Sequence, residues 1–282
     1  MIVDELLYHG IPTWVVKRNI RKVLRKTDLD QTATDAELRL LFEEVLSHEL
    51  TNREACCIAH IETLRARLKA SEKKIAIRDY GAGTSLLGKG ALQRRESVVR
   101  HAALATIVRY SKPPLHALVL FKLIRHFHPR ACLELGTCLG ISSAYIGSAL
   151  KLNGNGKLLT LEGAGSLAQL ARRHFSELDL NNIGLITGPF RKSLPAALKR
   201  MPELDFVFID GHHDGRATLA YLDRIKPYLA SRAFLVFDDI SWSPGMRRAW
   251  NQIRRQAGMV HAIDLGMFGM CAYDLNKAGQ DS

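Results

Sequence analysis

The 282-residue sequence contains only five cysteines, and they form no CxxC pair. Their odd number, with Cys56 and Cys57 adjacent, argues against a disulfide framework and favours reduced thiols that fill buried space. No segment approaches the roughly 18 consecutive apolar residues that a membrane span requires. The N-terminus also lacks an apolar core followed by a small-residue cleavage site. These absences predict a soluble cytoplasmic protein.

The composition is typical of a globular protein, because 47% of the residues are hydrophobic and 24% are charged. It excludes a collagenous or disordered chain. Forty lysines and arginines against 28 aspartates and glutamates give a net charge of +12. Residues 1–129 hold 22 basic and 14 acidic residues, and residues 130–282 hold 18 and 14. The excess lies mainly in the N-terminal part, where the basic cluster between residues 17 and 26 is typical of a solvated helix face.

Residues 34–74 carry apolar side chains at helical spacing, which predicts two helices with a break near Leu50. Thr51 and Glu54 form the pattern of a capping box at the start of the second helix. Residues 79–90 are rich in glycine and predict a loop, after which we expect helices near 92–110 and 114–127. The segment from Asp79 to Gly83 looks like a nucleotide-binding loop, but no second strand with a terminal carboxylate follows at the right interval. We assign it a structural or substrate-facing role.

After Pro129, short apolar runs alternate with helical segments. The predicted strands are 131–135, 157–162, 183–187, 205–209, 233–238, 260–265 and 268–274. Crossover helices fit between the first five, for example at 142–152, 167–178 and 216–229, which indicates parallel strands. Only Gly266 and Met267 separate the last two strands, so these form an antiparallel pair at the end of the sheet. The prediction is an α/β fold: a doubly wound, Rossmann-like, seven-stranded sheet with a helical N-terminal extension.

The first strand of this sheet runs into a loop with glycines at positions 136 and 140. Glycine lets the backbone turn sharply and approach a ligand, while the following helix presents free amides. The spacing is not that of G-x-G-x-x-G. The second strand ends in Glu162, a position from which a carboxylate grips ribose hydroxyls in doubly wound folds. Loop and carboxylate together predict a nucleoside-containing ligand.

At these residues the sequence resembles the class I S-adenosylmethionine (SAM)-dependent methyltransferases, in particular the catechol O-methyltransferase-like group and methyltransferase family 24. The resemblance covers about residues 130–275 and implies SAM as cofactor. It also implies a helical extension over residues 1–110 and a methyltransferase domain over residues 111–282. Glu162 would hold the ribose. The other cofactor-binding residues that it implies are Glu134, Gly136, Thr137, Gly140, Ser142, Gly188 and Asp210.

Three aspartates follow the fourth and fifth strands: Asp210, and the pair Asp238 and Asp239. Parallel strands present their carboxyl ends at one edge, so these side chains should converge and repel one another. A hard divalent cation would relieve the conflict, and Mg²⁺ is the natural choice. In the catechol O-methyltransferase-like group, aspartates in these positions hold such an ion. Asp239 departs from the asparagine often found there.

The same family places a proton acceptor three residues after the first of these aspartates, and here that residue is His213. An imidazole can take the proton of a hydroxyl near neutral pH. The resemblance therefore implies that His213 and Asp210 are catalytic. Alternatively, His212 and His213 bond to nearby backbone, and Asp214 caps the next helix. Trp242 either packs on an acceptor ring or covers the sheet edge.

The predicted function is metal-assisted O-methylation of a small hydroxylated molecule such as a sugar, a phenol or another secondary metabolite. One alternative is an RNA or other macromolecule methyltransferase that uses the basic N-terminal region, although no nucleic-acid-binding module is recognisable. Another is a cofactor-binding protein without catalysis. We expect residues 111–114 to lie near the amino-acid end of the cofactor. The basic N-terminal helix could mediate homodimerisation, receive an anionic substrate or touch a membrane surface.

Overall fold

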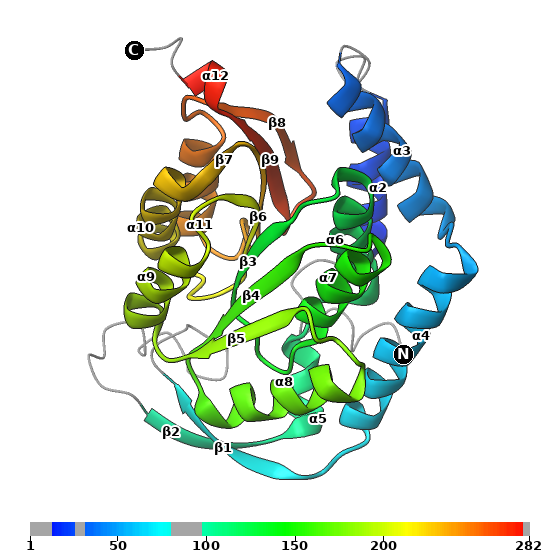
Figure 1. The fold of residues 1–282 in the computed structure, drawn as a ribbon, viewed down its shortest axis with the longest axis vertical. Helices are drawn as coiled ribbons and strands as arrows, with labels where there is room; N and C mark the ends of the chain where they lie inside the picture. Colours follow the sequence, from blue (N-terminus) through cyan, green and yellow to red (C-terminus); the bar gives the residue numbers. More distant parts are fainter. Residues whose placement is uncertain (1–12, 26–31, 80–97, 279–282) are drawn as a thin grey trace.

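The computed structural model describes residues 13–25, 32–79 and 98–278, and its centre is a seven-stranded sheet (Figure 1). The strands are, in spatial order, β5 (Ile183–Thr187), β4 (Lys157–Glu162), β3 (Ala131–Leu135), β6 (Leu204–Ile209), β7 (Leu229–Phe237), β9 (Gly269–Asp274) and β8 (Met259–Asp264). β5, β4, β3, β6 and β7 pair in parallel, and β9 lies antiparallel between β7 and β8. The predicted doubly wound sheet and its final antiparallel pair are confirmed.

Helices cover both faces of this sheet, as parallel strands require. One face packs against α6 (Pro114–Phe127), α7 (Ile141–Leu152) and α8 (Gly165–Glu177). The other packs against α9 (Phe190–Arg200), α10 (Gly215–Ile225) and α11 (Pro244–Ile253), as Figure 1 shows. A short 3-10 helix, η5 (Lys226–Tyr228), leads into β7, and α12 (Leu275–Ala278) follows β9. The strands therefore leave only their ends available for a ligand.

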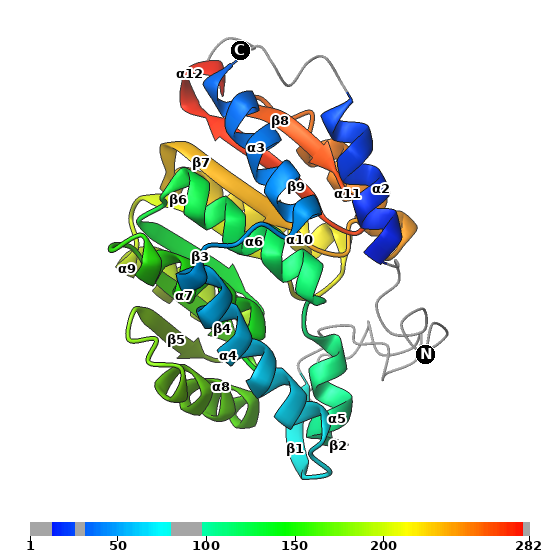
Figure 2. The same ribbon diagram turned by 90° about the vertical axis from the view of Figure 1, so that its right-hand side faces the viewer.

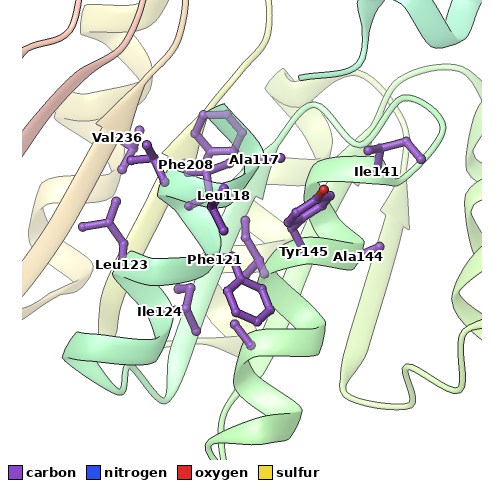
Figure 3. Close-up of a cluster of buried hydrophobic side chains, with 14 of the residues drawn as sticks. Ala117, Leu118, Phe121, Leu123, Ile124, Ile141, Ala144, Tyr145, Phe208 and Val236 are labelled. Atoms are coloured by element: carbon purple, nitrogen blue, oxygen red, sulfur yellow. The ribbon is translucent and has the colours of Figure 1, made fainter. Parts of the chain in front are cut away.

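Helix α6 is enclosed on all sides between the sheet and its neighbouring helices. Its ten residues from Leu115 to Ile124 are all buried, since side chains around its whole circumference are packed. Figure 3 shows Phe121 of α6 near Tyr145 of α7, with Phe208 and Val236 contributed by the sheet. The Phe121 and Tyr145 rings meet edge to face at 6.4 Å between centroids. This packing fixes the position of the segment that enters α6.

Three N-terminal helices pack outside α6 and α7: α2 (Thr13–Leu24), α3 (Ala33–Ser47) and α4 (Asn52–Lys69) (Figure 2). Residues 48–51 separate α3 from α4, and Thr51 and Glu54 form the predicted capping box. The apolar stripe of α2, Val16, Ile20 and Val23, is buried, which leaves its basic residues on the outer side. These helices share one continuous hydrophobic core with the sheet. The boundary at residue 110 stays a prediction.

The helix predicted near 92–110 is wrong for residues 98–103. They form β2 (Val98–Ala103), which pairs antiparallel with β1 (Lys74–Asp79). Only α5 (Leu104–Ile107) and the 3-10 helix η4 (Val108–Tyr110) are helical, and residues 80–97 lie outside the described part. Residues 98–103 pair with a strand that lies 19 to 29 positions earlier, which satisfies their backbone hydrogen bonds. A helical pattern within 92–110 carries no information about that distant partner.

All five cysteines are free, but the prediction that they fill buried space holds only for Cys132 and Cys271, since Cys56 is exposed and Cys57 and Cys138 are partly exposed. Among the described residues, no helix is both long and apolar enough to cross a membrane.

A buried ion-pair network joins α4 to α6. The Glu54 carboxylate accepts hydrogen bonds from Lys122 Nζ at 3.1 Å and from Arg125 Nε at 2.9 Å, and it also accepts the Thr51 backbone N–H. Burial alone would raise the pKa of Glu54, but these three donors together lower it below the usual 4.5. The ionised carboxylate is therefore favoured by folding.

We expect Glu54→Gln to lower the free energy of unfolding at pH 7 by about 3 kcal/mol, because it breaks a buried ion pair. A lowered folded-state pKa contributes stability that is complete above the unfolded pKa and is lost as the pH falls through the folded value. The difference between wild type and variant should therefore shrink below about pH 4.5. Urea unfolding across pH measures it, with Glu72→Gln on the exposed surface as the control. A difference that stayed constant down to pH 3 would contradict this account.

Candidate active site

The loop after β3 passes within contact distance of the end of β6. Gly136 has φ +108°, and a Cβ placed on it would lie 1.9 Å from the Asp210 carbonyl oxygen. Its N–H donates to the Leu161 carbonyl at 3.0 Å, which holds the loop against β4 as well. A residue without a side chain is therefore required here. The close approach brings the glycine loop and the aspartate at the end of β6 into one site.

Glu134 is buried inside the protein behind this loop. Its carboxylate accepts hydrogen bonds from the Ser142 and Thr160 hydroxyls, each at 2.6 Å, and from the Ser143 hydroxyl. Burial raises the pKa of Glu134 to about 7, and the three hydroxyls oppose the shift. Thr137, also buried, bonds to the Thr160 hydroxyl at 2.6 Å. Glu134 thus ties β3, β4 and α7 together, and contact of these side chains with a cofactor stays a prediction.

Glu162 closes the other side of the loop. One carboxylate oxygen accepts the Cys138 N–H at 2.7 Å and the other accepts the Ala164 N–H at 2.8 Å. A carboxylate has two acceptor oxygens, which suits a pair of ligand hydroxyls. Nearby, Gly188 has φ +139°, and its N–H donates to the Glu162 carbonyl at 2.8 Å. The carboxylate is fixed where the sequence places the ribose site.

The ends of β6 and β7 bring Asp210 and Asp238 together around a lysine from the N-terminal side of the chain. Lys112 Nζ lies 3.1 Å from Asp210 Oδ1 and directly contacts Asp238 Oδ2. Burial alone would lower the pKa of Lys112, but the charges of Asp210, Asp238 and Asp239 outweigh it and raise the pKa above its usual value. The lysine is therefore a charged ammonium between two carboxylates.

His213 pairs with the third aspartate of the cluster: its Nδ1 lies 2.8 Å from Asp239 Oδ2. Burial lowers the pKa of His213, but the Asp239 hydrogen bond and charge, with a smaller contribution from Asp210, raise it above the usual value. Both residues have left-handed backbones, with φ 29° at His213 and 55° at Asp239. Such strain is held only where the surroundings fix it, and it is frequent at functional sites. The second ring nitrogen of His213 is left for another partner.

The donor set partly resembles a metal site. Asp210, His213 and Asp238 each present a ligand atom, and these atoms lie within 4.8 Å of one another. However, the Lys112 ammonium contacts both carboxylates, and the predicted third ligand, Asp239, is engaged with His213. With Lys112 in this position the residues do not fit a divalent ion, since a second cation would meet the ammonium at the same oxygens.

Side chains in the loops that follow β6 and β7 make further contacts around this cluster. The Asp214 side chain accepts the Ala217 N–H at 2.9 Å and caps α10, which is the structural role weighed from the sequence. His212 Nδ1 lies 2.8 Å from the Tyr221 hydroxyl. Trp242 is 44% exposed, and its ring centroid lies 6.2 Å from that of His213. An aromatic surface therefore borders the histidine.

Sequence reasoning missed Lys112. The sequence predicts that residues 111–114 lie near the amino-acid end of the cofactor, which stays a prediction, and the structure brings Lys112 of this segment into contact with Asp210 and Asp238. The only local signal is a lysine followed by two prolines, Pro113 and Pro114, ahead of an apolar helix. A residue before proline is restricted to extended conformations, so the approach of Lys112 to the site is constrained.

Comparison with known proteins agrees with this geometry. Residues 133–240 match a family described as a methyltransferase domain. An O-methyltransferase from Bacillus cereus in complex with SAH shares 22% identity and a TM-score of 0.52, over 61% of this chain and 86% of that one. The O-methyltransferase TomG from Streptomyces achromogenes, in complex with SAM, shares 22% identity and a TM-score of 0.50, over 58% and 81%.

A SAH-bound methyltransferase from Podospora anserina shares 15% identity and a TM-score of 0.55, over 86% of this chain and 96% of that one. No curated protein matches this chain. Residues 133–240 are thus similar to a methyltransferase domain, and the solved structures share the fold of this chain.

We expect Gly136→Ala to destabilise the protein strongly, because its Cβ would overlap the Asp210 carbonyl and its backbone would be strained by about 1–3 kcal/mol before any clash. Thermal unfolding measures the loss. Gly165→Ala is the matched control, since a Cβ there meets nothing within 4 Å and should leave the melting temperature unchanged. Equal melting temperatures for the two variants would refute the close approach.

Proposed function

We propose that this protein is a SAM-dependent methyltransferase that methylates a hydroxyl group of a small molecule. The observation that carries the proposal is the His213–Asp239 pair beside Asp210, at the sheet edge that also carries the glycine loop. A base next to a methyl-donor site is the minimum that O-methylation requires. The named O-methyltransferases among the structural neighbours support the same reaction class.

The residues present fit SAM. Gly136 and Gly140 both have a positive φ, so the loop turns sharply at its two ends, and the Glu162 carboxylate is the kind of acceptor that a pair of ribose hydroxyls requires. We assign the methionine portion to the loop and to Asp210, next to which Gly136 lies. Gly188 borders the Glu162 end of the site. When bound, SAM supplies an electrophilic methyl group on a positively charged sulfur.

His213 acts in this proposal as the general base. Asp239 holds Nδ1, so the opposite ring nitrogen accepts the proton of the acceptor hydroxyl. Asp239 raises the pKa of His213, so it also stabilises the imidazolium that forms when His213 takes the proton. Asp239 is thus a positioning residue rather than the predicted metal ligand. Burial of the cluster strengthens these interactions, and no step of the mechanism uses Mg²⁺, because Lys112 contacts the carboxylates that would bind it.

A small acceptor fits the surroundings better than RNA. Trp242 offers a half-exposed ring face close to His213, which suits a phenol or a sugar. Methyl transfer from labelled SAM to a panel of hydroxylated metabolites tests the proposal, with structured RNA as a second panel. Labelling of hydroxyl compounds supports it, whereas labelling of RNA alone would overturn it.

Glu162→Ala should weaken SAM binding by roughly 10- to 100-fold, since hydrogen bonds to a charged group contribute about 1.5–3 kcal/mol. Isothermal titration calorimetry measures the affinity. Glu203→Ala, an exposed glutamate at the opposite end of the sheet, should bind as wild type does. Equal affinity of the two variants would reject the ribose assignment.

His213→Ala should lower kcat by about 10²- to 10⁴-fold, the usual contribution of a general base, and should leave SAM affinity unchanged. His212→Ala is the control: it loses the Tyr221 contact in the same loop but no base, so its loss should be several-fold at most. Single-turnover kinetics separate the chemical step from binding. Equal losses in both variants would mean that the loop, and not the base, is what matters.

A further inference from the structure

Lys112 is held in place by the aspartates of the candidate active site. Its side chain is 11% exposed, and it bridges the carboxylates of Asp210 and Asp238, which belong to two neighbouring strands. Lys112 lies in the segment between η4 and α6. Two prolines follow it directly, and α6 is packed in the core, so the direction in which the lysine reaches the cluster is fixed. A freely rotating surface lysine would not be held between two carboxylates in this way.

The hydrogen-bonding capacity of Lys112 is not exhausted by these contacts. An ammonium group has three N–H donors; Lys112 donates to Asp238 and forms an ion pair with Asp210. One ring nitrogen of His213 and one carboxylate oxygen each of Asp210 and Asp238 lie within 4.8 Å of one another. An acceptor oxygen held at this cluster would therefore lie beside the Lys112 ammonium, which contacts the same two carboxylates.

We infer that Lys112 is the resident cation of this active site: its ammonium takes the place of a divalent metal and holds the acceptor oxygen by a hydrogen bond. The first half of this inference is that the ammonium replaces a metal ion, and the second half is that it binds the acceptor oxygen. Only the second half rests on the proposed O-methylation. In the reaction, the acceptor O–H bond breaks and its proton passes to His213. The oxygen lone pair forms the bond to the methyl carbon, and the electron pair of the broken C–S bond stays on sulfur. Lys112 keeps its proton throughout and offsets the charge that develops on oxygen.

The first half is tested without any acceptor, by titrating the purified protein with Mn²⁺ and following the electron paramagnetic resonance signal of the free ion. We expect no specific site in the wild type and one new site in Lys112→Met, because removal of the ammonium frees the ligand set of Asp210, His213 and Asp238. Lys112→Met/Asp238→Asn should lose that site again. Lys199→Met, on the exposed surface of α9, should behave as wild type.

A wild-type protein that binds one equivalent of Mn²⁺ at a specific site would overturn the inference, and this measurement needs no variant to fold. If Lys112→Met proves unstable, Lys112→Arg keeps a cation and should likewise bind no Mn²⁺. An Arg variant that binds the ion would also count against the lysine as the competing charge.

The second half is tested in the labelled-methyl assay. Wild-type turnover should be unchanged by chelator, and Lys112→Met should lower kcat at least 10²-fold with unchanged SAM affinity. Turnover that chelator abolishes and Mg²⁺ restores would overturn the role of Lys112. If no acceptor is methylated while the Mn²⁺ contrast holds, the proposed function fails and the assignment of the resident cation stands.

Discussion

Strands β6 and β7 end side by side, and the three aspartates that follow them bring like charges into one largely buried place. Unpaired carboxylates in such a position cost several kcal/mol each, so the site depends on cations that enter it. Lys112 meets Asp210 and Asp238, while His213 meets Asp239. The same pairing that makes the cluster tolerable also positions the groups that act as base and counter-charge in the proposed reaction.

This requirement links the N-terminal part of the chain to the chemistry. Lys112 stands just before α6, the helix enclosed between the sheet and the N-terminal helices, and Glu54 of α4 binds Lys122 and Arg125 on that helix. The N-terminal helices therefore do more than cover the sheet, because they hold the helix that brings Lys112 to the aspartate cluster. Two thirds of the net positive charge lies in this part of the sequence, and one of those charges is Lys112.

The glycine loop shows how far a local pattern reaches. Gly136 and Gly140 were identified from their spacing after a strand, and the structure supplies the reason for the first: the Asp210 carbonyl leaves no room for a Cβ. Glu162 lies at the end of its strand as predicted, bound to the loop amides. Glu134 differs, since its carboxylate faces three hydroxyls inside the protein. The sequence spacing predicted correctly where these residues stand on the strands and the loop. It gave no information about the direction in which a carboxylate points.

Apolar periodicity and strand ends are local properties, so the amino-acid sequence predicts the strands of the central sheet, its crossover helices and the edge where the aspartates gather. Non-local contacts are visible in the folded chain alone: residues 98–103 pair with β1, Asp239 contacts His213, and Lys112 lies between two carboxylates. Lys112 and Asp238 are 126 positions apart. No local pattern links them, since their meeting follows from how α6 packs on the sheet, and that packing is a property of the whole core.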